Sequence, residues 1–208
     1  MKACIWDFDG TVMDTYPGMT AAMLSALQAR GVPCTEVEVL DRLKDSLGAC
    51  VRAYARETGM DAQALERAFR VEERQRMELF RPMDGIREVL TRDTPGIRHF
   101  LWTHRDRAAL ELLKREGLLD CFEDAVTEES GFPRKPDPAA LVSLLRDHAL
   151  EAGACVMIGD RPLDVRAGRR GGARTILLDP EARFPEEACD ARVRHVSEIP
   201  GILAEWKY

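Results

Sequence analysis

The sequence has no long hydrophobic run and no paired cysteines. No apolar stretch approaches the roughly 20 residues of a membrane-spanning helix, and the apolar residues before Asp7 are too few for a signal peptide. The six cysteines are scattered, without a C-x-x-C pair or a histidine at metal-ligand spacing, so they indicate neither a zinc site nor a disulfide framework. Scattered thiols are typical of a reducing compartment, and we therefore expect a cytoplasmic protein.

Positive charge is scarce relative to negative charge. The chain has 30 lysines and arginines against 36 aspartates and glutamates, a formal net charge of -6. This balance gives no general attraction to nucleic acid or to an anionic membrane, so a small anionic substrate fits better than a polymer. With 208 residues, 45% of them hydrophobic, the chain can bury one core and carry a smaller inserted domain. It need not oligomerise to fold, and its oligomeric state is left open.

Five short apolar runs precede polar residues that can carry chemistry, and helical patterns separate them. The runs are Ala3 to Trp6, His99 to Trp102, Ala125-Val126, Cys155 to Ile158 and Thr175 to Leu178. This alternation predicts an α/β fold with a doubly wound parallel sheet covered on both faces. Such sheets bind ligands at the carboxyl ends of their strands, which is where the polar residues fall.

The stretch from about Thr15 to Phe80 interrupts the alternation, because it has helical periodicity and no convincing strand. Thr35 and Glu38 form a capping-box pattern for one of its helices. A last long helix is predicted to carry Leu65 and to extend to Phe80.

Residues 81–85 then read as a turn back into the main domain. We therefore predict an α/β core domain of residues 1–14 and 82–208. Residues 15–81 are predicted to form an inserted helical cap domain that acts as a lid.

Asp7 and Asp9 lie two residues apart at the end of the first apolar run, so a strand would send both carboxylates to one side. Gly10 then allows the backbone to approach a ligand closely. Paired carboxylates suit phosphoryl transfer, because one can attack phosphorus while the other protonates the leaving oxygen and later activates water. The alternative is an exposed acidic turn after an edge strand.

Asp160 and Asp164 follow the fourth run at a spacing of four, which places them on one face of a turn or helix. Three carboxylates around a phosphate dianion would repel it unless a cation intervened. Carboxylate and water oxygens, with no histidine or cysteine nearby, point to Mg²⁺. Alternatively, Asp160 only caps the helix before Pro162.

Lys135 precedes Asp137, which can cap a helix, and Pro138, which can occupy the first turn of that helix. A lysine fixed there can neutralise a nucleophilic carboxylate and the phosphoryl oxygens. Thr103 ends the second run and offers its hydroxyl and its backbone N–H to a phosphate oxygen. The alternatives are a surface charge at Lys135 and a simple cap at Thr103.

The order of these motifs resembles the haloacid dehalogenase-like superfamily of hydrolases. It consists of D-x-D-G-T at residues 7–11, then Thr103, Lys135, and Gly159-Asp160 with Asp164, and the resemblance covers essentially the whole chain. Within this superfamily, the chain is similar to the phosphoglycolate-phosphatase-like members of subfamily IA, which have a helical cap of the C1 type. The resemblance implies a magnesium-dependent phosphatase for a small phosphorylated metabolite.

The resemblance also implies a role for each motif residue. Asp7 would be the nucleophile that forms an aspartyl-phosphate, and Asp9 the general acid/base whose backbone carbonyl also meets the metal. Thr103 and Lys135 would hold the transferring phosphoryl group, with Gly10 beside it.

Asp160 would bind Mg²⁺ directly, and Asp164 would lie in its inner or outer coordination sphere. Together with Asp7 and Asp9, these two carboxylates would make up the metal site.

Departures from the family pattern narrow the reaction. Dehalogenating members lack the second carboxylate, so Asp9 favours a phosphate substrate over a halide. Phosphomutase-like members usually carry a histidine about ten residues after that carboxylate. Met19 stands near this position here, which argues against mutase activity. Where many family phosphatases have an asparagine after the Ser/Thr of this motif, the chain has His104, followed by Arg105. His104 could contact the leaving group and Arg105 or Arg161 a second anionic group, or these residues could be rim residues tied to neighbouring carboxylates.

The sequence is compatible with two alternative activities. A phosphotransferase or phosphomutase would use the same core residues and differ only in the acceptor. A non-catalytic receiver-type module would also gather acidic residues, a threonine and a lysine around an acceptor aspartate. Receivers are shorter, however, and have no helical insert after the first strand. The sequence does not select the substrate.

Overall fold

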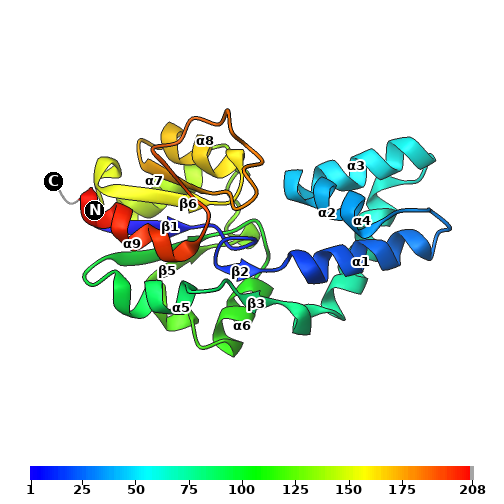
Figure 1. The fold of residues 1–208 in the computed structure, drawn as a ribbon, viewed down its shortest axis with the longest axis horizontal. Coiled ribbons are helices and arrows are strands. Elements are labelled where there is room, and N and C mark those ends of the chain that lie inside the picture. Colours follow the sequence, from blue (N-terminus) through cyan, green and yellow to red (C-terminus); the bar gives the residue numbers. More distant parts are fainter. Residues whose placement is uncertain (207–208) are drawn as a thin grey trace. The chain divides into compact units, whose positions relative to one another are not determined.

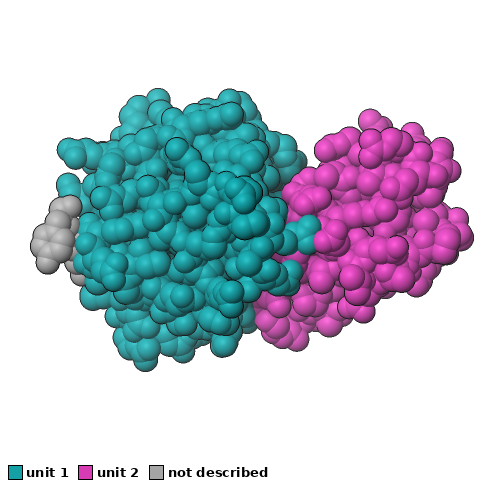
Figure 2. Space-filling model, turned by 45° about the horizontal axis from the view of Figure 1, so that its top comes forward, with its two compact units in different colours: residues 1–13, 82–208 teal, residues 14–81 magenta. Residues whose placement is uncertain are grey.

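The computed structural model describes residues 1–206 and divides the chain into two compact units. Unit 1 comprises residues 1–13 and 82–208, and unit 2 comprises residues 14–81 (Figure 2). The chain passes between them at β2 (Met13–Asp14) and β3 (Arg81–Pro82), which form a two-stranded sheet. Arg81 and Pro82, predicted as part of a turn, are therefore in a strand, and the turn follows at Asp84 and Gly85.

Unit 1 is built on a six-stranded parallel sheet in the order β5-β4-β1-β6-β7-β8 (Figure 1). Its strands are β1 (Ala3–Trp6), β4 (Arg98–Trp102), β5 (Asp124–Val126), β6 (Cys155–Gly159), β7 (Arg174–Leu178) and β8 (Ala191–Val193). The central strand β1 is buried along its whole length, as a strand covered on both faces must be. The predicted α/β fold with a doubly wound parallel sheet and an inserted helical unit is confirmed.

Helices cover both faces of this sheet. They are α5 (Ile86–Glu88), continued by a π-helical segment (Val89–Asp93), α6 (Ala108–Arg115), α7 (Ala139–Asp147), α8 (Pro162–Arg170) and α9 (Ile199–Glu205). Figure 1 shows α7 and α8 on one face and α5, α6 and α9 on the other. Phe100 and Trp102 of β4 pack with Leu141 of α7 and Ala167 of α8 in one hydrophobic core.

Unit 2 is helical, as predicted. It contains α1 (Tyr16–Gln28), α2 (Glu36–Asp45), α3 (Leu47–Thr58), α4 (Ala62–Arg74) and a 3₁₀ turn (Met77–Leu79). The capping box before α2 is present, because the Glu38 N–H donates to Thr35 Oγ1 at 3.3 Å and the Thr35 N–H donates to Glu38 Oε2 at 2.9 Å. The function of this unit as a lid stays a prediction.

The prediction of one long helix from Leu65 to Phe80 is wrong. Helix α4 ends at Arg74, the 3₁₀ turn Met77–Leu79 follows, and Phe80 itself is extended. Phe80 is fully buried, and a Cβ atom at Gly18 would lie 2.4 Å from its ring. The Phe80 ring thus packs against Gly18 of α1, and no glycine or proline stands at Arg74 to mark the end of α4 in the sequence. No helix within residues 1–206 combines the length and apolar character that crossing a membrane requires.

Candidate active site

The predicted site residues gather at the carboxyl ends of three neighbouring strands. Asp7 follows β1, Thr103 follows β4 and Asp160 follows β6, and β1 lies between the other two. Asp164 is in the first turn of α8. Lys135 precedes α7, whose N-cap is Pro138 without a side-chain cap bond, so the predicted cap by Asp137 with Pro138 in the first turn is wrong. Asp137 Oδ1 instead accepts the Ala139 N–H at 2.9 Å in the turn just ahead of the helix. The edge of a parallel sheet thus brings together residues far apart in sequence.

Lys135 is the centre of this arrangement. Its Nζ donates to Asp7 Oδ1 at 2.6 Å, to Asp164 Oδ1 at 2.8 Å and to the Trp102 carbonyl oxygen at 2.8 Å. The side chain is 0% exposed. A buried ammonium group requires partners for its charge and its three N–H donors, and these acceptors satisfy both needs. The alternative of a surface lysine is therefore excluded.

Three carboxylates form a possible cation site. Asp7, Asp160 and Asp164 each offer one oxygen atom, and the three atoms lie within 4.8 Å of one another. Asp7 Oδ2 is buried and has no hydrogen-bond partner within residues 1–206, and Arg161 Nη2 lies 3.6 Å from it. An unsatisfied buried carboxylate oxygen in an all-oxygen cluster fits a hard divalent cation such as Mg²⁺.

Asp164 enters the cluster because β6 ends in a glycine. A Cβ atom at Gly159 would lie 2.3 Å from Asp164 Cβ, so only glycine leaves room for this carboxylate. Burial, reinforced by the charge of Asp7, raises the pKa of Asp164, while the nearby Lys135 opposes the shift. The N-cap of α8 is Arg161, whose backbone N–H donates to Asp164 Oδ2 at 3.2 Å. The alternative of Asp160 as a helix cap is therefore excluded.

Asp9 lies beside the cluster and pairs with Arg105. Arg105 Nε donates to Asp9 Oδ1 at 2.7 Å and Oδ2 at 3.0 Å, and the Arg105 N–H donates to Thr103 Oγ1 at 3.0 Å. The guanidinium is nearly buried, so this ion pair holds the Asp9 carboxylate in one orientation. Of the alternatives for Arg105, the structure shows the tie to a neighbouring carboxylate.

His104 faces the lysine segment. Its Nε2 accepts the Lys135 backbone N–H at 2.8 Å, so the imidazole proton belongs on Nδ1. Burial, together with the charges of Lys135, Arg134 and Arg161, lowers the pKa of His104 to about 3. His104 is therefore neutral near pH 7, and its Nε2 is occupied by the protein backbone.

A family model for haloacid dehalogenase-like hydrolases matches residues 4–178. The chain belongs to this family. A phosphoglycolate phosphatase from Rhodospirillum rubrum is 30% identical over 85% of this chain and 79% of its own length. An N-acetylmuramic acid 6-phosphate phosphatase from Pseudomonas aeruginosa is 27% identical over 98% and 95%. The crystal structure of a predicted phosphoglycolate phosphatase from Haemophilus somnus is 18% identical over 97% of each chain, with a TM-score of 0.84, and shows the same fold.

Two backbone N–H groups of this haloacid dehalogenase-like hydrolase have partners inside the protein. The Thr103 N–H donates to the Val126 carbonyl at 2.9 Å, so the expectation that it serves a phosphate oxygen is wrong, because β4 continues its pairing with β5. The Thr103 hydroxyl hydrogen remains able to donate. Gly10 has a φ of 71°, and its N–H donates to the Met13 carbonyl at 2.8 Å. Gly10 thus supplies a left-handed turn.

The structure places two further groups in the candidate active site that the motif residues alone do not predict. The Trp102 carbonyl is the third acceptor of Lys135, and a main-chain group leaves no signal in a sequence. Arg161, named as a possible anion-binding residue, lies between two members of the cluster, with Nη2 3.6 Å from Asp7 Oδ2 and Nε 3.4 Å from Asp160 Oδ1. Its position directly after Asp160 is the only sequence signal for this.

Proposed function

We propose that the protein is a magnesium-dependent phosphatase that hydrolyses a small phosphate monoester through an aspartyl-phosphate on Asp7. The predicted enzyme class, a phosphoric monoester hydrolase, is confirmed by the family match and by the named activities of both relatives. The observation that carries the finer proposal is the buried Lys135 ammonium shared by Asp7 and Asp164 at the edge of the sheet. This arrangement places a positive charge beside two carboxylates at the point where a phosphate dianion must approach.

In this proposal Asp7 attacks phosphorus. Lys135 holds Oδ1, while Oδ2 has no hydrogen-bond partner among the described residues, so the carboxylate keeps lone pairs for phosphorus and for a cation. A bond forms between Asp7 and phosphorus, and the bond from phosphorus to the alcohol oxygen breaks. Asp9 supplies the proton of the departing alcohol, for which it must be protonated when the substrate binds, so its ion pair with Arg105 belongs to the states in which Asp9 is ionised. Water then attacks the aspartyl-phosphate, Asp9 takes the proton of that water, and phosphate leaves with Asp7 restored.

Neighbouring groups support both steps. Lys135 Nζ and the Thr103 hydroxyl would donate to the oxygens of the transferring phosphoryl group, which carries negative charge throughout. Arg105 would orient Asp9 between the steps through its bonds to both carboxylate oxygens.

Asp7, Asp160 and Asp164, with the Asp9 backbone carbonyl, would hold Mg²⁺. A bound ion would reduce the repulsion between these carboxylates and the phosphate dianion.

The substrate in this proposal is a small phosphorylated metabolite. The two relatives act on phosphoglycolate and on N-acetylmuramic acid 6-phosphate, which differ in size and share a phosphate monoester. The negative net charge of the chain is consistent with a small substrate bound by local groups.

The test is phosphate release from p-nitrophenyl phosphate with Mg²⁺ by the wild type and by Asp7→Asn. Losing the nucleophile should reduce the rate by roughly two to three decades or more. The matched control is Asp120→Asn, which removes the same charge from an exposed position and should keep the wild-type rate. Equal rates for the wild type and Asp7→Asn would reject the proposal. Analysis of the products with an added sugar acceptor separates hydrolysis from transfer.

A further inference from the structure

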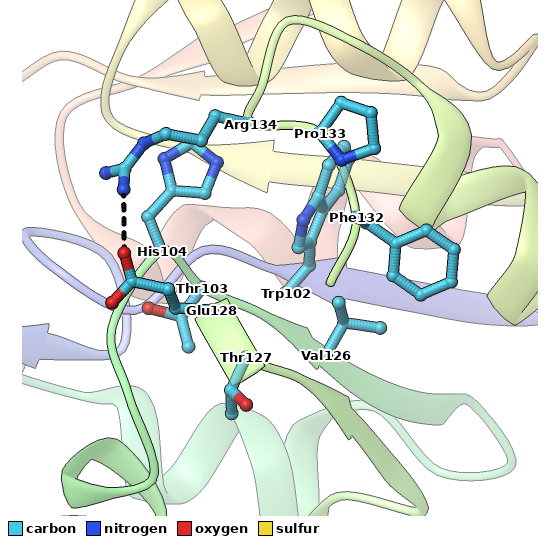
Figure 3. Close-up of a pocket in the computed structure, with 9 residues that line it drawn as sticks. All are labelled: Trp102, Thr103, His104, Val126, Thr127, Glu128, Phe132, Pro133 and Arg134. Carbon is cyan, nitrogen blue, oxygen red and sulfur yellow. Dashed lines mark hydrogen bonds and ion pairs between the residues drawn. The ribbon is translucent and has the colours of Figure 1, made fainter. Parts of the chain in front are cut away.

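A cavity of about 180 Å³ lies in unit 1 next to the candidate active site (Figure 3). We call it the β4–β5 cavity, and its walls are residues 102–104, 126–128 and 132–134. Trp102, Val126 and Phe132 give it an apolar side, and His104 and Arg134 give it a polar side. This space is large enough for the alcohol portion of a small metabolite.

The β4–β5 cavity shares its walls with the phosphoryl site. The Trp102 carbonyl accepts from Lys135 Nζ, and His104 Nε2 accepts from the Lys135 N–H. Thr103, whose hydroxyl can meet a phosphoryl oxygen, also lines the cavity, and Arg134 directly precedes Lys135. A molecule whose phosphate lies at Lys135 therefore has this cavity as its neighbouring space.

The loop that encloses the β4–β5 cavity is held at both ends by active-site residues. At its start the Glu128 N–H donates to the Arg105 carbonyl at 2.9 Å, and at its end the Lys135 N–H donates to His104. Within the loop, Gly131 takes a left-handed φ of 76°. The cavity is thus formed before any ligand arrives, which lowers the ordering cost of binding.

One ion pair in the cavity wall can change partners. Arg134 Nη1 lies 3.3 Å from Glu128 Oε1, and the two side chains are 61% and 54% exposed (Figure 3). An exposed pair with a single long contact contributes little to stability. An incoming carboxylate or phosphate can therefore replace Glu128 at Arg134 with little loss, while the apolar wall covers the carbon atoms of the ligand.

We propose that the β4–β5 cavity binds the alcohol portion of the substrate, and that Arg134 binds an anionic group on it after releasing Glu128. This inference rests on the proposed function and adds a substrate class, small phosphate esters whose alcohol portion is itself anionic. Arg134 is then a specificity residue, and Glu128 is an internal competitor for it.

The test uses two pairs of esters that are matched in size and differ in charge. One pair is 2-phosphoglycolate and its neutral amide, and the other is 4-carboxyphenyl phosphate and 4-carbamoylphenyl phosphate. The readout is the ratio of kcat/KM for the anionic ester to that for its neutral partner, so that a general loss of activity cancels. Arg134→Met should lower this ratio roughly tenfold to a hundredfold in at least one pair, the range of one charge-assisted hydrogen bond. Glu128→Gln should raise the ratio in that pair.

The control is Arg107→Met, which breaks the exposed Arg107–Glu129 ion pair outside the cavity and should keep the wild-type ratio. If Asp7→Asn abolishes phosphate release but Arg134→Met has the wild-type ratio in both pairs, the cavity proposal is overturned and the proposed function stands. If phosphate release does not depend on Asp7, both are overturned.

Discussion

His104 and Lys135 are joined by a hydrogen bond from the Lys135 backbone N–H to His104 Nε2, at 2.8 Å. The bond fixes the main chain at Lys135, whose Nζ is shared by Asp7 and Asp164. Because its Nε2 already serves this bond, His104 acts on the reaction through Lys135. The structure therefore gives the Nε2 atom of His104 a positioning role, which differs from the predicted tie to a carboxylate and leaves this atom no bond for the leaving group, while the ring also lines the β4–β5 cavity.

Replacing His104 should separate positioning from substrate contact. His104→Ala removes the acceptor of a largely buried N–H, which costs about 1–3 kcal/mol and should lower kcat by roughly tenfold or more, with a smaller change in KM. His104→Gln can place its Oε1 near the position of Nε2, and we expect it to restore most of kcat. The measurement is steady-state kinetics with p-nitrophenyl phosphate.

The pH profile provides the second readout for His104. Since the pKa of this imidazole is about 3, the wild type and His104→Gln should have pH–rate profiles of the same shape between pH 5 and 8. A limb near pH 6.5 that disappears in His104→Gln would show that the imidazole titrates during turnover and would contradict the positioning role.

Lys135 should stabilise the fold as well as the reaction. Lys135→Met leaves the carboxylates of Asp7 and Asp164 buried without their shared ammonium, and breaking such a pair costs about 3–5 kcal/mol. We expect a lower Tm for this variant in EDTA. A cation bound at the cluster would replace part of the lost charge, so Mg²⁺ should raise the Tm of Lys135→Met more than that of the wild type.

The same melting experiment checks the residues of the cation site. Asp160→Asn should reduce the Mg²⁺-dependent rise in Tm, while Asp120→Asn, an exposed substitution elsewhere, should keep it. Identical Tm values with Mg²⁺ and with EDTA in every variant would argue against a cation at this cluster.

Gly159 should tolerate no side chain. Gly159→Ala places a Cβ atom 2.3 Å from Asp164 Cβ, so β6 or α8 must shift, and overpacking of this kind costs about 1–3 kcal/mol. Because the shift displaces a member of the cluster, we expect activity to fall more steeply than stability. The control is Gly153→Ala, where a Cβ atom meets nothing within 4 Å. Chemical denaturation and phosphate release measure the two effects, and wild-type activity in Gly159→Ala would refute this account of the glycine.

The parts of the fold that the sequence predicts are those marked by an unbroken apolar run or by helical periodicity. The strands β1, β4, β5, β6 and β7 are apolar runs because both faces of a parallel sheet are covered. The edge strand β8 was missed, since Ala191–Val193 is short and includes a partly exposed arginine. The end of α4 at Arg74 is not predicted by the sequence, because no helix-breaking residue stands there and Phe80 is buried although it lies outside the helix.

The candidate site also has features that the sequence predicts and features that it does not. The convergence of Asp7, Asp160 and Lys135 was predictable because each residue stands at the end of a strand or before a helix, and parallel strands align those ends. The partners of His104 and Arg105 were not predictable. The Arg105–Asp9 pair joins residues 96 positions apart, and the His104 bond depends on how the loop before α7 closes. Such pairings follow from loop geometry.

His99 predicts how the stability of the fold depends on pH. Its Nδ1 accepts from Trp6 Nε1 at 3.1 Å, and its Nε2 lies 3.0 Å from Thr94 Oγ1, whose hydroxyl donates to the Val89 carbonyl. This network requires a neutral imidazole with its proton on Nε2, since a proton on Nδ1 would face the Trp6 N–H. Burial lowers the pKa of His99 to about 4, against an ordinary value of 6.5.

The sign of the effect follows from these two values. Above pH 6.5 the folded and unfolded states both have neutral His99, and its full contribution to stability is present. As the pH falls from 6.5 to about 4, the unfolded state binds a proton that the folded state does not, so the free energy of unfolding falls by about 1.4 kcal/mol per pH unit for this group. His99→Asn keeps an acceptor near Nδ1 and removes the titrating group. Urea denaturation between pH 7 and 4.5 should therefore give a shallower loss of stability for His99→Asn than for the wild type, whatever its stability at pH 7. Parallel pH dependences for the two proteins would show that His99 does not contribute.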